Sequence, residues 1–370
     1  MARFSAFALL AVPWLFLATL VNGDAVLDLQ NKGRAAFDAA LAKSTTCTKE
    51  KLQVRREWGD ITVAERKAYI SAMLCLMSKP SKLPAGQFPG AQNRYDDFVV
   101  VHMNQTLTIH GTGNFLSWHR YFTWAMENAL RTECGYTGTQ PYWDWGRWAQ
   151  DPEKSPIFDG SDSSMSGNGK KISHRGTAFA PAGNGGGCVE TGPFKNMTVR
   201  LGPMSVAVDP APARNPRADG YGNNPRCLRR DISNQLSSRY GRTQDIVSLI
   251  NNARTIANFQ DMMQSNNGVH NTGHFTIAGD PGGDFYISPN DPAFWLHHSM
   301  IDRTWHIWQI QDYANRQQVI AGGTSMMSFG FGGRQQALSD PVDLGVVGPK
   351  VYKISELVSI VEGPFCYVYE

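Results

Sequence analysis

Apolar residues recur at helical spacing in four stretches of the chain, and this pattern predicts a mainly α-helical protein. Residues 24–80 are predicted to be helical and contain two of these stretches, and the Lys79-Pro80 step is expected to end the second helix. The other two cover residues 119–130 and 294–313, and each carries a histidine in line with its apolar side chains. The apolar faces consist of Leu27, Leu29, Ala35, Phe37 and Ala40; Tyr69, Met73 and Leu76; Phe122, Met126 and Leu130; and Ile301, Trp305 and Trp308.

The segment 158–228 has a different character from these helices. It contains Gly-Ser-Asp-Ser-Ser, the run Gly183-Asn-Gly-Gly-Gly187 and several prolines, which are typical of loops. The glycine run lacks the GxxxxGK[ST] pattern of a phosphate-binding loop. No second core pattern appears, so we expect one domain with a helical bundle core, long loops and little β-structure, although the length would allow two domains.

The N-terminus has the features of a secretory signal peptide. Arg3 precedes the apolar run Phe7 to Leu20, and Val21-Asn22-Gly23 resembles a signal-peptidase cleavage site with a small residue at its end. Pro13 interrupts the run and no positive cluster follows it, which argues against a membrane anchor. We therefore expect residues 1–23 to be a signal peptide, residues 24–370 to be the mature domain, and the protein to be secreted.

Composition narrows the class of protein. The chain has 370 residues, of which 42% are hydrophobic, 11% aromatic and 18% charged, so a large core is available and disorder is excluded. The net charge is only +3, with no basic block, which argues against a nucleic-acid or membrane surface. A small molecule is the expected partner.

The cysteines and sequons agree with export. Six cysteines without CxxC spacing predict disulfides, with Cys188–Cys227 as the favoured pair because both lie in loop-like sequence. Asn104-Gln-Thr and Asn196-Met-Thr are expected N-glycan acceptors.

The histidines are clustered rather than scattered. Eight of the nine lie in residues 102–119 and 270–306, and only His174 stands apart. A single histidine on an apolar face is usually a core residue, and a lone HxxxH is weak evidence for metal. Two triplets together are stronger evidence, because six neutral imidazoles in apolar surroundings are costly without a cation. The triplets are His102, His110 and His119, and His270, His274 and His298.

The donor type indicates the metal. An all-imidazole set suits copper or zinc, and three ligands per ion leave open positions for catalysis. Zinc hydrolases usually add a general base as in HExxH, whereas none of these histidines is followed by Glu. The pattern therefore favours two copper ions that hold dioxygen between them.

Three long motifs carry a family resemblance. They are His110-Gly-Thr-Gly-Asn-Phe-Leu-Ser-Trp-His119-Arg-Tyr-Phe, Gln140-Pro-Tyr-Trp-Asp-Trp145, and Asn290-Asp-Pro-Ala-Phe-Trp-Leu-His-His298-Ser-Met-Ile-Asp-Arg-Thr-Trp305. They resemble the type-3 copper signatures of tyrosinases and catechol oxidases, and the chain looks most similar to short secreted fungal polyphenol oxidases. The resemblance extends from Arg55-Arg56-Glu-Trp58 to Tyr367-Val-Tyr369, which resembles the tyrosine motif at the end of the family's catalytic domain.

The resemblance implies a ligand set. One copper ion (CuA) would be held by His102, His110 and His119, and the other (CuB) by His270, His274 and one of the pair His297 and His298. Family members place the last ligand seven residues after the Asp of the Asp-Pro step, which selects His298. His297 would then be a hydrogen-bonded neighbour, and His306 a solvated or supporting residue. Asp302 would orient an imidazole or tie its helix to a neighbouring helix. Asp144 would have a similar supporting role, or would hold the bend of the chain between Trp143 and Trp145.

The resemblance also implies the residues that control the substrate. Asn271 and Phe275 follow the first two CuB ligands and bear on phenol deprotonation, with Asp261 as a candidate carboxylate that would orient a water with Asn271. Phe285 falls at the gate position and resembles the bulky gate of plant catechol oxidases. Asn271 resembles the tyrosinase choice, so these cues conflict.

Two features depart from many fungal tyrosinases. Thr108 stands where those enzymes carry a cysteine joined to the second CuA histidine, so we expect His110 to be unmodified. The chain stops just after the tyrosine motif, so we expect no C-terminal lid domain and no need for proteolytic activation.

Three functions are compatible with these sequence features. The favoured one is copper-dependent oxidation of o-diphenols to o-quinones with dioxygen, with hydroxylation of monophenols as a further activity. A hemocyanin-like carrier would bind dioxygen reversibly, and a zinc hydrolase would contain zinc. A single domain with a signal peptide favours the oxidase over the carrier.

Overall fold

The computed structural model describes residues 24–205, 208–326 and 333–370, and it confirms the expected helical architecture. The predicted signal peptide lies outside these residues. The helices are α1 (Ala25–Lys32), α2 (Arg34–Lys43), α3 (Val63–Ser78), α4 (Arg94–Ile109), α5 (Phe115–Cys134), α6 (Asn234–Tyr240), α7 (Thr243–Asn252), α8 (Ile256–Gln264), α9 (Val269–Ile277), α10 (Ala293–Ile310) and α11 (Tyr313–Arg316), with short 3-10 turns η1 (Pro152–Lys154), η2 (Ser288–Asn290), η4 (Gly345–Val347) and η5 (Ile354–Glu356). No helix in these ranges has the length and apolarity needed to cross a bilayer.

Local sequence explains where the main helices begin and end. Thr62 and Glu65 form a capping box at the start of α3, and Asn93 and Asp96 form one at the start of α4. Helix α3 ends at Ser78, just before the predicted Lys79-Pro80 step. Helix α5 ends at Cys134 and is capped by Gly135, whose φ of 70° lies in the left-handed region that glycine adopts without strain.

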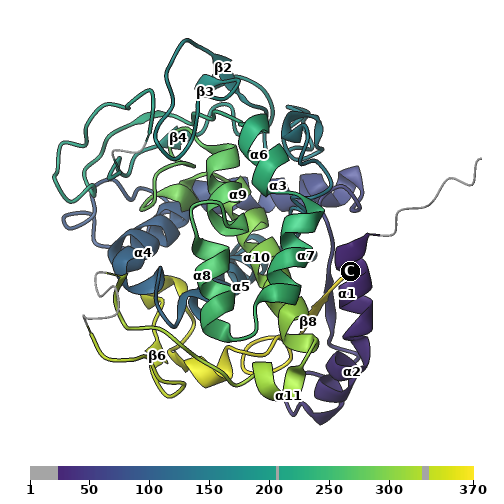
Figure 1. The fold of residues 1–370 in the computed structure, drawn as a ribbon. Coiled ribbons are helices and arrows are strands. Elements are labelled where there is room, and N and C mark those ends of the chain that lie inside the picture. The colour runs from purple at the N-terminus through teal and green to yellow at the C-terminus, as the bar shows by residue number, and fades with distance from the viewer. Residues whose placement is uncertain (1–23, 206–207, 327–332) are drawn as a thin grey trace, which may run out of the picture.

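Helices α5 and α10 form the centre of the molecule, with α7, α8 and α9 lying over them in the view of Figure 1. Every residue of α10 is buried, although the helix includes histidine, aspartate, arginine and glutamine side chains. Buried polar groups are costly unless they have partners. Helix α10 is therefore where polar partners or ligands are expected.

Among the residues that the structure describes, the β-strands form four two-stranded sheets, as expected for a protein with little sheet. The pairs are β1 (Gln53–Arg55) with β8 (Tyr367–Tyr369), β2 (Gly169–Lys171) with β3 (Gly186–Val189), β4 (Thr198–Val199) with β5 (Arg226–Cys227), and β6 (Pro341–Val342) with β7 (Tyr352–Lys353). The interpretation of residues 24–80 as helical throughout was wrong at β1. This strand pairs in parallel with β8, so its conformation depends on residues more than 300 positions away.

Three disulfides fasten elements that are distant in sequence. Cys188 bonds to Cys227 as predicted, and links β3 to β5 in the long loop region. Cys75 bonds to Cys134 between α3 and α5, and Cys47 bonds to Cys366 beside the β1–β8 sheet. All six cysteines are therefore paired, and none is free to bond to His110. Thr108 is exposed and its hydroxyl donates to the carbonyl of Gln105.

Candidate metal centre

The first histidine triplet comes together as predicted. His102 lies in α4, His110 caps the end of that helix, and His119 lies in the first turns of α5. One ring nitrogen from each lies within 4.8 Å of those of the other two, and all three side chains are buried. The loop between α4 and α5 thus brings the three imidazoles to one point.

Backbone carbonyls orient these three rings. The Nδ1 atoms of His102, His110 and His119 lie 2.8, 2.9 and 2.8 Å from the carbonyl oxygens of Tyr286, Thr106 and Phe115. A carbonyl only accepts, so each Nδ1 carries the proton and each Nε2 keeps a lone pair. The Nε2 atoms of His102 and His119 are buried and have no partner. Such atoms are expensive in a core, and a bound cation removes the cost.

The second group contains one histidine more than predicted. His270 and His274 lie on α9, and His297 and His298 lie on α10, with ring nitrogens within 4.8 Å of one another. The Nε2 atoms of His274 and His298 are 3.1 Å apart, so both point toward the same spot. The His298 ring stacks on His119, with centroids 4.6 Å apart, so the two groups adjoin.

A hydrogen bond separates the roles of His297 and His298. The indole Nε1 of Trp145 donates to Nδ1 of His297 over 3.1 Å, so the ring proton of a neutral His297 lies on Nε2. A protonated Nε2 offers no lone pair to a cation. The adjacent His298 has no such donor, and its Nε2 faces that of His274. Trp145 was placed in a motif by the sequence, but its partner was visible only in the fold.

Burial keeps all of these imidazoles neutral. It lowers the pKa of His102 to about 3 and that of His110 to about 4, and nearby His110 adds to the shift at His102. Burial also holds the pKa of His119 and of His298 well below the ordinary value. Neutral imidazole is the form that binds a metal ion, so the site is prepared for cations at pH 7.

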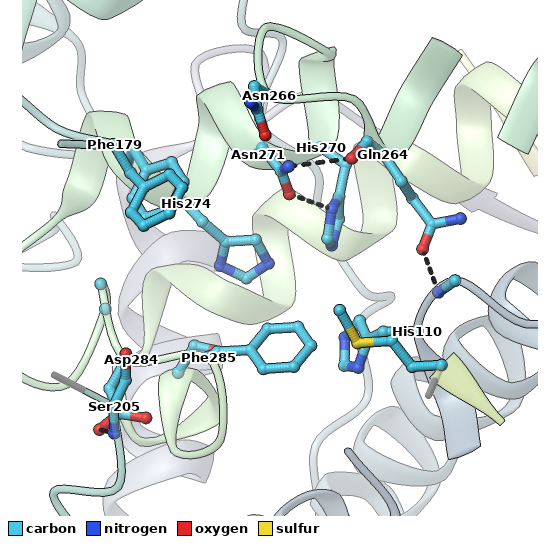
Figure 2. A pocket seen from close by; sticks show the side chains of 16 residues that line it. His110, Phe179, Ser205, Gln264, Asn266, His270, Asn271, His274, Asp284 and Phe285 are labelled. Carbon is cyan, nitrogen blue, oxygen red and sulfur yellow. Dashed lines mark hydrogen bonds between the residues drawn. The ribbon is translucent and has the colours of Figure 1, made fainter. Parts of the chain in front are cut away.

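A cavity of about 320 Å³ reaches both histidine groups. Figure 2 shows His110, His270 and His274 at its wall, with the ring of Phe285 beside His110 and below the two histidines of α9. The Phe285 ring lies 4.6 Å from that of His110, centroid to centroid, and is only partly buried. The position predicted for a gate is therefore at the cavity wall beside a candidate ligand.

Three of the four residues predicted to control the substrate line this cavity: Asn271, Phe275 and Phe285. Asp261 does not. It lies exposed on α8 and is absent from the cavity lining, because α8 buries the face that carries Phe259, Gln260 and Met263. The cavity's carboxylate is Asp284, which the sequence did not single out.

The hydrogen bonds of Asn271 leave it little freedom. Its Oδ1 accepts from Nδ1 of His270 over 2.9 Å, and its Nδ2 donates to the carbonyls of Gln264 and Ser265, both over 3.0 Å (Figure 2). Both N–H donors of the amide are used. Asn271 therefore orients His270 as the carbonyls orient the first triplet.

Asp284 is also committed to the backbone. Its carboxylate accepts from the N–H groups of Met204, Ser205 and Tyr286, over 2.7, 2.8 and 2.9 Å. Burial raises its pKa, and these three donors partly oppose the shift. The carboxylate thus fixes the segment that carries Phe285.

Asp302 and His306, two residues of α10 near the histidine groups, are both buried but have different contacts. Asp302 lies between α10 and α5, as expected of a residue that ties helices together: its Oδ1 accepts from Arg120 over 2.5 Å, and its Oδ2 accepts from the hydroxyls of Tyr367 and Tyr369 over 2.6 and 2.5 Å. His306 is not solvated, which corrects one alternative, because it is buried against the ring of Phe37.

Asp144 holds the bend of the chain between Trp143 and Trp145. It accepts from the backbone N–H of Gly146 over 3.0 Å and lies 3.5 Å from a guanidinium nitrogen of Arg303 on α10. The bend that carries Trp145 is thereby attached to the helix that carries His297.

Comparison with known proteins identifies the family of this centre. The common central domain of tyrosinase matches residues 92–311, which include both histidine groups. The chain belongs to the tyrosinase family. Tyrosinase P of Aspergillus terreus is 38% identical over 332 residues, covering 85% of this chain and 91% of that protein. N-acetyl-6-hydroxytryptophan oxidase of Emericella nidulans is 39% identical over 363 residues, covering 91% and 97%.

Solved structures agree with this assignment. A polyphenol oxidase from Thermothelomyces thermophila is 40% identical, with a TM-score of 0.86, and the match covers 93% of this chain and 97% of that one. A functional unit of octopus hemocyanin, 16% identical with a TM-score of 0.51 over 86% and 68%, shares the fold. The predicted type-3 copper family and its helical core are confirmed.

The tyrosinase family implies a dinuclear copper centre, and the histidines fit one. Both groups consist of neutral imidazoles, and four of them have Nδ1 fixed by an oxygen acceptor. The Nε2 atoms of His102, His119 and His270 are buried and unpartnered. An all-imidazole set with oriented rings suits copper.

Proposed function

We propose that this tyrosinase-family oxidase converts o-diphenols to o-quinones with dioxygen as the oxidant. The observation that carries the proposal is the paired histidine groups, with oriented rings and partnerless Nε2 atoms, below a cavity large enough for a phenol. Small-molecule sites usually have cavities of about 300 to 1,000 Å³. A dioxygen carrier needs no such opening to its metals.

We assign CuA to His102, His110 and His119, and CuB to His270, His274 and His298. His297 is left out of the set because its accepting nitrogen already receives the indole N–H of Trp145. Bound copper would supply the electron transfer and dioxygen chemistry that side chains lack. Each o-diphenol gives up two electrons and two protons, so two of them reduce one dioxygen to two waters.

The chain's own residues orient the phenol and restrict its approach. The rings of Phe275 and Phe285 present apolar surface at the cavity wall, so a phenol ring is expected to lie between them with its hydroxyls toward the histidines. Asp284 fixes the segment of Phe285 through three hydrogen bonds. The gate is therefore rigid, and it limits the angle at which a phenol enters.

Diphenol oxidation is favoured over monophenol hydroxylation. Monophenol chemistry is helped by a base that removes the phenol proton. The amide donors of Asn271 are already used, and Asp261 is on the surface. Asp284 is the carboxylate among the described cavity residues, and it accepts three backbone donors. We therefore propose that Asn271 positions His270 rather than orienting a catalytic water.

The test combines metal analysis with oxygen uptake. We expect two copper ions per chain, rapid oxygen uptake with catechol, and slow uptake with phenol at equal concentration. A zinc-loaded sample should be inactive. Reversible oxygen binding without quinone formation would overturn the oxidase proposal in favour of a carrier, and activity with zinc alone would overturn the copper assignment.

Asn271→Ala tests the role of the amide. If Asn271 positions His270, copper affinity falls by about 10- to 100-fold and both phenol classes lose activity together. If it orients a water instead, copper content stays at two per chain and only phenol turnover falls. Thr108→Ala, on the exposed end of α4, is the matched control and should change neither quantity.

We also propose that the protein is secreted and glycosylated. Three disulfides support an oxidising compartment. Asn104 and Asn196 are both exposed, as glycan acceptors need to be. One relative is named for oxidation of N-acetyl-6-hydroxytryptophan, so substrates within the family extend beyond simple catechols. Intact mass before and after deglycosylation tests both sites.

A further inference from the structure

Phe179 is an exposed aromatic side chain at the cavity wall. It comes from the long loop region between β2 and β3, and 53% of its surface is exposed. Its ring stacks nearly parallel on that of Phe275, with centroids 6.0 Å apart and planes 12° apart. Figure 2 shows it near His274, on the far side of the cavity from His110. An exposed aromatic at a cavity is a site for a further apolar contact.

The loop that carries Phe179 is fastened at several points. Both ring nitrogens of His174 face acceptors: Nδ1 is 3.0 Å from the carbonyl of Ile172, and Nε2 is 2.6 Å from Asp231. The same Asp231 accepts from the backbone of Gly183 and Gly185, over 2.8 and 3.0 Å. Because both ends of the segment are held, Phe179 is preorganised for binding.

The cavity is larger than one phenol ring requires. A dry cavity of about 150 Å³ is enough to bind benzene. The cavity here is about 320 Å³, so a ring at the histidines leaves space of similar size toward Phe179.

The charge of the cavity restricts what can fill that space. Among its described lining residues there is no lysine or arginine, and its one carboxylate is engaged by backbone donors. A substituent with a carboxylate would find no cationic partner there. A substituent with a planar apolar group would find the rings of Phe179 and Phe275.

We propose that Phe179 and Phe275 form an outer aromatic subsite that selects phenols bearing an uncharged, planar apolar substituent on the ring. The inference rests on the proposed function, because it assumes that the reacting ring lies at the histidines. Phe179 is a specificity residue in this proposal, since it contacts the substituent and not the reacting atoms. One aromatic pair changes binding by about two- to twelvefold.

Equilibrium binding to the protein loaded with copper(I), measured without oxygen, tests the subsite, because no oxidant is then present to convert the catechol to a quinone. The ligands are catechol, 4-phenylcatechol and L-3,4-dihydroxyphenylalanine. We expect 4-phenylcatechol to bind about tenfold more tightly than catechol, and the charged amino acid to bind no more tightly than catechol. Phe179→Ala should reduce the tenfold preference to about twofold, whereas Phe179→Trp should retain it.

Val63→Ala is the matched control, because Val63 is equally exposed (52%) but lies on α3 and is absent from the cavity lining. It should keep the full preference. The proposal is overturned if Phe179→Ala keeps the tenfold preference, or if the wild-type protein shows none. Failure of the proposed function would appear instead as absent copper-dependent oxygen uptake with catechol, which the anaerobic measurement does not involve.

Discussion

Asp302→Asn tests how the candidate centre is held together. The substitution keeps the shape of the side chain and removes its charge. In the structure the carboxylate accepts from Arg120 and from the hydroxyls of Tyr367 and Tyr369, and it lies 3.5 Å from a guanidinium nitrogen of Arg55. All of these side chains are buried. Asp302 thus joins α10 and α5, which carry His298 and His119, to the C-terminal strand.

The expected cost follows from the buried charges. Removing one partner of a buried ion pair destabilises a protein by about 3 to 5 kcal/mol, because the remaining charge is unpaired. Arg120 would lose its carboxylate partner, while Arg55 keeps a second buried partner in Glu127. We therefore expect Asp302→Asn to lower the free energy of unfolding by about 3 to 5 kcal/mol, a large share of the roughly 5 to 15 kcal/mol typical of a folded protein.

Urea denaturation of the metal-free protein, followed by tryptophan fluorescence, measures this change without a contribution from bound metal. Asp261→Asn on the exposed surface of α8 is the control, and it should change the free energy of unfolding by no more than about 0.5 kcal/mol. A loss below about 1 kcal/mol for Asp302→Asn would refute the argument that this carboxylate compensates buried arginine charge.

Acid provides a second check on Asp302. Burial alone would raise the pKa of Asp302, but the charges of Arg120 and Arg55 and the two tyrosine hydroxyls hold it below its ordinary value. The charged form is therefore favoured in the folded state. Its contribution is complete above the unfolded-state pKa of about 3.9 and is lost as pH falls through the folded-state pKa. The stability difference between wild type and Asp302→Asn should shrink over that range.

Three further substitutions test separate parts of the structure. Trp145→Phe leaves Nδ1 of His297 without its donor and should cost about 1 to 3 kcal/mol in urea denaturation, while copper content stays at two per chain; a loss of one copper would show that His297 is a ligand. Replacing Cys47 and Cys366 with serine opens a loop of 319 residues and should cost roughly 5 kcal/mol, and a change under 1 kcal/mol would contradict the loop-closure argument. His174→Gln should destabilise the loop mainly at low pH. Burial lowers the pKa of His174, but its hydrogen-bond acceptors raise that pKa overall, so the stabilisation by His174 is present below about pH 6.5 and is lost as pH rises through the folded-state pKa. The rate of proteolysis of the loop at pH 5 and pH 9 measures this change. Equal protection of wild type and variant at pH 5 would contradict that assignment.

Much of the centre could be predicted from local sequence. The helices of residues 119–130 and 294–313 follow from apolar spacing, because a helix positions residues three and four apart on one face. The two histidine groups follow from clustering and from long motifs. The family resemblance, and not spacing alone, placed Asn271, Phe275 and Phe285 at the site, and all three line the cavity.

Contacts between distant segments could not be predicted in this way. Strand β1 was taken as part of a helical stretch because its pairing with β8 leaves no local signal. Asp261 was placed in the site by its distance along the chain, but it lies on the face of α8 that packing leaves exposed. Phe179 lies in a loop without helical or strand periodicity, so its contact with Phe275 depends on how that loop folds back.

The sequence by itself determined the family, the helical core and the two sets of imidazoles, because these depend on residue types at fixed short spacings. Tertiary structure decided which of two adjacent histidines keeps a free nitrogen, which carboxylate reaches the cavity, and what lines its outer wall. Those outcomes depend on single hydrogen bonds and ring contacts between segments far apart in the chain, such as Trp145 with His297. Tertiary packing sets which way these side chains point, and no local sequence pattern encodes that packing.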